Sequence, residues 1–172
     1  KDINTGGSSS MPTGFTVLNS TLYFRANDGV NGYELWKTDG TSLGTVLVKN
    51  INSVDGSYPT NFQVSHEKLY FSAYNEEAVS VIWESDGTLE GTIQISEIES
   101  DRLRAVGTTL FFEGYEITYG KELWAYKQDY TAPAVDILGV PEDWQSTSAI
   151  LTTDCTDDMS GCDVNSYGYR IE

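Results

Sequence analysis

The sequence predicts an all-β protein built from a repeated unit of short antiparallel strands. Two observations carry this prediction. The phrase ELWKTDGTSLGTVLVKNI at residues 34–51 returns as VIWESDGTLEGTIQISEI at residues 81–98. The 172 residues also include 11 tyrosines and 16 glycines but only 4 prolines. Aromatic and β-branched residues favour a pleated sheet, and glycine favours the turns between strands.

Each copy of the repeat contains about four strand signals. Asp39-Gly40 is a hairpin signal, because glycine accepts positive φ without a steric penalty. Four short antiparallel strands in roughly 40–50 residues is the spacing of a β-propeller blade. In the first copy we expect strands at Phe15–Leu18, Leu22–Ala26, Tyr33–Lys37 and Thr45–Val48.

The repeat occurs about three times. Trp36, Trp83 and Trp124 occupy equivalent positions, 47 and then 41 residues apart. KDI at residues 1–3 matches KNI at residues 49–51, so we expect the chain to begin on the last strand of an earlier copy. No Asp-Gly-Thr turn follows Trp124. We therefore assign residues 1–128 to propeller-like repeats.

Residues 129–172 do not continue the repeat pattern. After a polar stretch that contains Pro133, strand signals occur at AVDILGV (134–140), SAILTTDC (148–155) and CDVNSYGYRIE (162–172). Three strands are marginal as an independent sandwich. We therefore expect residues 129–172 to be the truncated start of a second module.

Both segments resemble known surface modules. Through Glu34-Leu35-Trp36, Asp39-Gly40-Thr41 and Gly44-Thr45, the repeat resembles the ELWxxDGT tandem repeats of large secreted and surface proteins of bacteria and archaea. Through TAPAVDILGVPEDW and LTTDCTDDMSGCDVNSYGYRI, the second segment resembles the start of an immunoglobulin-like surface module. The resemblance implies β-propeller-like blades followed by a partial Ig-like β-sandwich, and it carries no catalytic set.

The charge balance narrows the classes of partner. The chain has 26 acidic and 10 basic residues, for a formal net charge of −16. Such a chain repels polyanions, so nucleic acid and anionic membrane surfaces are disfavoured. Divalent cations, carbohydrate and protein surfaces remain open. No stretch is long and apolar enough to span a bilayer.

The only cysteines, Cys155 and Cys162, enclose six residues. A turn between them brings a disulfide within reach, and we expect one in an exported protein. Two buried thiols are the alternative, whereas zinc lacks enough ligands. Acidic side chains crowd the same loop and suit Ca²⁺, with a solvated acidic loop as the alternative. These residues are Asp154, Asp157, Asp158 and Asp163.

Other candidates are mostly architectural. We expect the three recurring tryptophans to pack between repeats, with a carbohydrate-stacking platform as the alternative. Asp28, Asn31 and Asp39 fall in hairpin loops, where Asn and Asp favour turns. Asn19 begins an N-glycosylation sequon at a surface turn. The tyrosines that we expect at the surface, as candidates for contact with a partner, are Tyr23, Tyr70, Tyr115 and Tyr119.

Catalytic material is scarce. His66 is the only histidine, it falls in a turn, and no nucleophile motif accompanies it. We therefore predict a non-enzymatic structural or adhesive segment of an extracellular cell-surface protein, such as a filament, sheath, S-layer or adhesin. Its expected partners are copies of itself or neighbouring surface proteins, and it requires no cofactor. A glycan- or protein-binding propeller module is the alternative, and a propeller hydrolase is a third.

Overall fold

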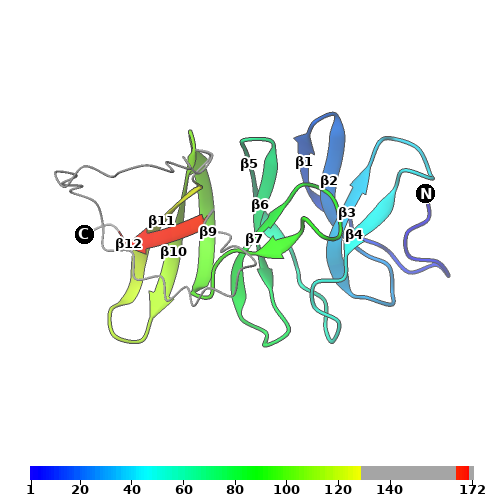
Figure 1. The fold of residues 1–172 in the computed structure, drawn as a ribbon. Coiled ribbons are helices and arrows are strands. Elements are labelled where there is room, and N and C mark those ends of the chain that lie inside the picture. Colours follow the sequence, from blue (N-terminus) through cyan, green and yellow to red (C-terminus); the bar gives the residue numbers. More distant parts are fainter. Residues whose placement is uncertain (129–165, 171–172) are drawn as a thin grey trace, which may run out of the picture.

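The computed structural model describes residues 1–128 and 166–170, and within these ranges the protein is all-β without helices (Figure 1). The predicted all-β class is confirmed. The strands form three four-stranded antiparallel sheets, and the order of strands in each sheet follows the chain. The first sheet contains β1 (Thr13–Leu18), β2 (Thr21–Asn27), β3 (Tyr33–Thr38) and β4 (Val46–Lys49).

The second and third sheets repeat this order. The second contains β5 (Thr60–Ser65), β6 (Lys68–Tyr74), β7 (Ser80–Ser85) and β8 (Ile93–Gln94). The third contains β9 (Glu99–Val106), β10 (Thr109–Glu116), β11 (Gly120–Gln128) and β12 (Ser166–Arg170). No helix long and apolar enough to cross a membrane occurs in the described ranges.

The last strand of the third sheet comes from the end of the chain. β12 pairs antiparallel with β11, with Arg170 opposite Trp124. It thus takes the place that β4 and β8 take in the first two sheets. The sequence assigned this strand to the second module, and the structure places it beside the repeats. Residues 129–165, which hold the rest of the predicted Ig-like segment, lie outside the described residues.

Short turns connect the first two strands of each sheet. Asn19 and Ser20 join β1 to β2 with φ values of 48° and 64°. His66 and Glu67 join β5 to β6 in the same way, with φ values of 44° and 59°. Two successive residues with positive φ are typical of the type I′ hairpin, whose twist matches the twist of paired strands. His66 therefore lies in the turn that the sequence predicted.

The three sheets lie side by side in chain order (Figure 1). Apolar residues of the second sheet pack against the first, and the equivalent residues of the third pack against the second. From the second sheet these residues are Leu69, Phe71, Ala73 and Trp83. From the third they are Leu110, Phe112 and Trp124. The second sheet therefore packs against the first sheet with one face and against the third sheet with the other.

The first sheet has the same pair of faces. In the first sheet, the residues equivalent to Leu69, Phe71, Ala73 and Trp83 are Leu22, Phe24, Ala26 and Trp36. They form a separate cluster with Ile3 and Leu47. Ile3 thus covers the first sheet from the N-terminal segment. Ile51, which follows β4, belongs to the cluster between the first and second sheets. This correspondence agrees with the match between KDI and KNI in the sequence.

Candidate functional site

The Asp-Gly-Thr turn between β3 and β4 is built by hydrogen bonds to Asp39. Its Oδ1 accepts bonds from the N–H and the hydroxyl of Thr41, both at 2.8 Å. The Thr41 hydroxyl oxygen accepts a third bond, at 2.9 Å, from the N–H of Gly44. A Cβ at Gly44 would overlap the Asp39 carboxylate. The bonds from Thr41 lower the pKa of Asp39, and they stabilise the turn.

The turn between β7 and β8 repeats this geometry. Asp86 Oδ1 accepts bonds from the Thr88 hydroxyl at 2.7 Å and from its N–H at 2.8 Å. These bonds lower the pKa of Asp86. In the loop after β2, Asp28 Oδ1 likewise accepts two backbone N–H bonds. The aspartates of these loops therefore stabilise the turns by accepting hydrogen bonds within them.

Lysine side chains tie the first and second sheets to the segments before them. Lys49, at the end of β4, donates to the carbonyl oxygen of Thr92 in the second sheet, with Nζ and O 2.6 Å apart. Lys1 donates to the carbonyl oxygen of Thr45 in the first sheet at 2.8 Å. Lys1 and Lys49 match in the sequence, as do Thr45 and Thr92. The same contact is therefore made twice.

Backbone contacts repeat in the same manner. The N–H of Tyr74 donates to the carbonyl oxygen of Ser57 at 2.8 Å, and the N–H of Asn27 donates to that of Ser10 at 2.9 Å. Tyr74 lies 47 residues after Asn27, and Ser57 lies 47 residues after Ser10, so the two hydrogen bonds are equivalent. The N-terminal segment thus lies against the first sheet as the linker after β4 lies against the second.

Glu34 is a buried carboxylate that holds this linker in place. Its Oε1 accepts bonds from the N–H groups of Asn52 at 3.2 Å and Ser57 at 2.9 Å. Its Oε2 accepts bonds from the N–H of Ile51 at 3.1 Å and the hydroxyl of Ser57 at 2.5 Å. Burial raises the pKa of Glu34, although these hydrogen bonds act in the opposite direction. The glutamate of the ELW motif therefore anchors the linker between the first two sheets to the first sheet.

The three equivalent tryptophans lie in the packed clusters. Trp36 and Trp83 are 6% and 7% exposed, and Trp124 is half-buried. The indole Nε1 of each is buried without a hydrogen-bond partner among the described residues. Lys49 Nζ also lies 5.9 Å from the centroid of the Trp83 ring. The buried rings of Trp36 and Trp83 do not offer a stacking face to carbohydrate.

Two of the four tyrosines expected at the surface are buried. Tyr23 and Tyr70 lie in the inter-sheet clusters, because their strand positions point toward the following sheet. The prediction was therefore wrong for these two residues. Tyr115 and Tyr119 are exposed as predicted.

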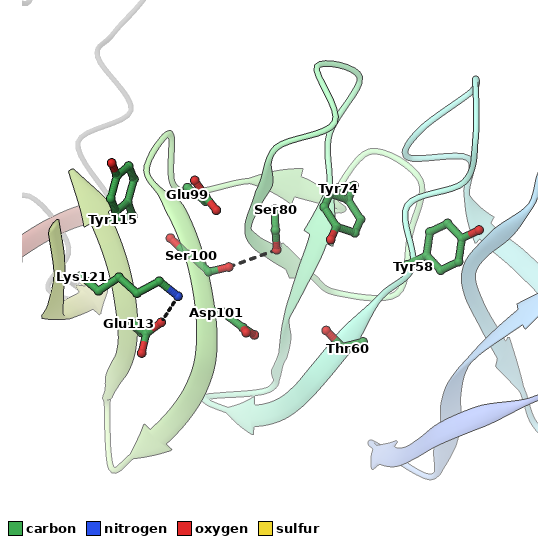
Figure 2. A pocket seen from close by; sticks show the side chains of 10 residues that line it. All are labelled: Tyr58, Thr60, Tyr74, Ser80, Glu99, Ser100, Asp101, Glu113, Tyr115 and Lys121. Carbon is green, nitrogen blue, oxygen red and sulfur yellow. Dashed lines mark hydrogen bonds and ion pairs between the residues drawn. The ribbon is translucent and has the colours of Figure 1, made fainter. Parts of the chain in front are cut away.

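A cleft of about 300 Å³ lies where the second sheet meets the third. Figure 2 shows Tyr58, Tyr74 and Ser80 on one side of the start of β9, and Tyr115 and Lys121 on the other. The ring centroids of Tyr58 and Tyr74 are 6.4 Å apart, and the rings meet edge to face. The remaining residues that line the cleft are Thr60, Glu99, Ser100, Asp101 and Glu113.

Polar contacts fix several side chains of this cleft. Lys121 Nζ lies 2.7 Å from Glu113 Oε1, and this ion pair lowers the pKa of Glu113. The Ser80 hydroxyl donates to the carbonyl oxygen of Ser100 at 3.1 Å (Figure 2). Asp101 Oδ1 accepts a hydrogen bond of 2.7 Å from the side-chain amide of Asn61. Sequence reasoning missed Tyr58 and Tyr74, because nothing local indicates that the linker and the end of β6 meet.

Some of the remaining predicted site residues lie outside the described ranges, and the others are exposed. Cys155, Cys162 and the acidic residues predicted to bind Ca²⁺ lie outside the described residues. Residues 1–128 and 166–170 contain no group of three or more His, Cys, Asp or Glu side chains that could hold a metal ion. Asn19 is exposed in its turn. His66 is also exposed, with Nδ1 2.9 Å from the hydroxyl oxygen of Ser65.

Comparisons with protein-family models, with curated proteins and with solved structures found no match to this chain.

Proposed function

We propose that the chain is a non-enzymatic structural segment of an extracellular cell-surface protein, such as a filament, sheath, S-layer or adhesin. Its sheets are propeller-like blades that add to one another through a repeated interface. The resemblance to ELWxxDGT repeats and the strong net negative charge support the surface location. The proposed partners are copies of this protein or neighbouring surface proteins.

The observation that carries this proposal is the repetition of the contacts between sheets. The Lys49–Thr92 bond and the Lys1–Thr45 bond join equivalent atoms. The apolar residues with which the second and third sheets meet the preceding sheet also have equivalents in the first sheet, where they pack with Ile3. In repeat proteins, such nearest-neighbour interfaces supply the stability and allow units to be added.

The outward face of the third sheet is suited to such an addition. Leu35 and Ile82, which point toward the following sheet, are 0% and 1% exposed. Their equivalent in the third sheet, Leu123, is 52% exposed. A hollow of about 390 Å³ lies on this face, lined in part by Phe111 and Leu123. We propose that a further sheet, from the same protein or a neighbour, covers Leu123.

A charge at this face tests the proposal. We expect Leu123→Asp in the full-length protein to shorten or abolish its assemblies, because a carboxylate is costly to bury in an apolar interface. Leu43→Asp is the matched control, since Leu43 is 92% exposed in a turn. Analytical ultracentrifugation and electron microscopy measure the outcome. Assemblies of Leu123→Asp that equal those of the control would count against a sheet-to-sheet contact here.

A further inference from the structure

The cleft between the second and third sheets originates in a local change in the repeat. Between the first and second sheets, the rings of Tyr33 and Tyr58 fill the equivalent space, with centroids 5.1 Å apart. Ser80 occupies the position of Tyr33 one repeat later, and Glu99 occupies the position of Tyr58. A hydroxymethyl group and a carboxylate replace two aromatic rings, so the space opens into the cleft.

The walls of this cleft present aromatic rings to solvent. Tyr58, Tyr74 and Tyr115 are 43%, 43% and 44% exposed. They come from the linker before β5, the end of β6 and the end of β10 (Figure 2). Tyrosine combines a large apolar ring with a polar tip, so it suits a surface that binds partly polar ligands.

Hydrogen-bonding groups surround these rings. Glu99 has no side-chain hydrogen bond or ion pair within the described part of the chain, so both its oxygens can accept hydrogen bonds. Thr60 and Ser80 supply hydroxyl groups, and Lys121 supplies an ammonium group that Glu113 holds in place. The volume of about 300 Å³ is at the lower end of the range for small-ligand sites, roughly 300–1,000 Å³.

We propose that this cleft binds a neutral carbohydrate. The apolar face of a sugar ring packs on the ring of Tyr74, and sugar hydroxyls donate to Glu99 and accept from Lys121. Anionic sugars are disfavoured, because the chain carries a net charge of −16 and three carboxylates line the cleft. The proposal does not depend on the structural role proposed above.

A small cation is the principal rival ligand. Tyrosine rings and carboxylates attract quaternary ammonium groups, and Arg25 already lies 5.4 Å from the centroid of the Tyr33 ring. However, the ammonium group of Lys121 lines the same cleft and neutralises Glu113. Lys121 offsets one of the three carboxylates of the cleft, so choline is the competing probe; the mixture of hydrogen-bond donors and acceptors favours a neutral polyol.

Titration with neutral disaccharides built from glucose, galactose, mannose or N-acetylglucosamine tests this inference, with choline as the competing probe. Saturation-transfer NMR and calorimetry measure binding. We expect at least one disaccharide to bind and to perturb ring protons of Tyr58 and Tyr74. Binding of choline alone, or of no probe, would overturn the proposal.

Variants identify the residues that make the site. We expect Tyr74→Ala to weaken disaccharide binding at least about tenfold and Tyr74→Phe to preserve it, because stacking uses the ring. Glu99→Gln should also weaken binding, since amide nitrogen does not accept. Tyr119→Ala is the control, because Tyr119 is exposed outside the cleft. If Tyr74→Ala does not fold, Tyr115→Ala replaces it. Unchanged affinity in the folded variant would overturn the assignment.

Discussion

The phenol oxygen of Tyr23 lies so close to Gly87 that a Cβ on this glycine would overlap it. Tyr23 belongs to the first sheet, and Gly87 belongs to the Asp-Gly-Thr turn of the second. The turn is therefore also a docking point between sheets. The equivalent glycine of the first sheet, Gly40, would place its Cβ in open space.

This difference makes the two glycines a matched pair. Gly40 and Gly87 have φ values of +94° and +89°, so alanine is strained to a similar degree at both. We expect Gly87→Ala to lower the free energy of unfolding by about 1–3 kcal/mol more than Gly40→Ala, because only Gly87 meets Tyr23. Urea denaturation measures both. Equal losses would contradict the inter-sheet contact.

The lysine contacts predict a second effect on stability. Lys49→Met removes the hydrogen bond to Thr92 but keeps much of the apolar stem. We expect it to lower the free energy of unfolding by about 1 kcal/mol, the usual net value of such a bond. Lys127→Met serves as the control, because Lys127 is exposed and makes no side-chain hydrogen bond within the described residues. A loss no greater than that of the control would refute a stabilising role for Lys49.

The buried carboxylate predicts a larger effect. In Glu34→Gln an amide N–H₂ takes the place of one oxygen and faces the donors of Ile51 or Ser57. We expect a loss of about 2 kcal/mol in the free energy of unfolding, because buried donors are left without acceptors. Glu122→Gln, at the equivalent position of the third sheet, is the exposed control. Thermal and urea unfolding compare the two, and similar losses would contradict the account of Glu34.

The same residue predicts a dependence on pH. Burial raises the pKa of Glu34 above its ordinary value of 4.5. The contribution of Glu34 to the free energy of unfolding is therefore complete below about pH 4.5, and it is lost as the pH rises through the folded-state pKa. The free energy of unfolding of the wild type, relative to Glu34→Gln, should fall as the pH rises from that value. Asp39 and Asp86 have lowered pKa values, so their contributions are lost in acid instead. A wild-type advantage that grows with pH would contradict the raised pKa.

The sequence predicted the parts of the fold that local chemistry determines. Alternation and the Asp-Gly-Thr motif indicated the strands and turns of the first copy, because side-chain bonds such as Asp39–Thr41 span only two residues. The sequence did not predict that Tyr23 and Tyr70 are buried. Alternation separates the two faces of a strand, but in a stack of sheets both faces are covered.

Long-range features were beyond local patterns. Glu34 looked like an ordinary strand residue, because its partners lie 17 to 23 positions away in the linker. The place of β12 in the third sheet depends on pairing between Trp124 and Arg170 across a long segment. The cleft depends on Ser80 and Glu99 taking positions that tyrosines occupy one repeat earlier. Comparing equivalent positions between copies would have revealed that last difference.

The central claim is that these sheets assemble with further sheets through one repeated interface. Electron microscopy of the native assembly at side-chain resolution tests it most directly. The account predicts that another four-stranded sheet covers Leu123, with apolar side chains at the positions equivalent to Phe71 and Trp83 in contact with it. Isolated particles in which Leu123 faces solvent would contradict the claim.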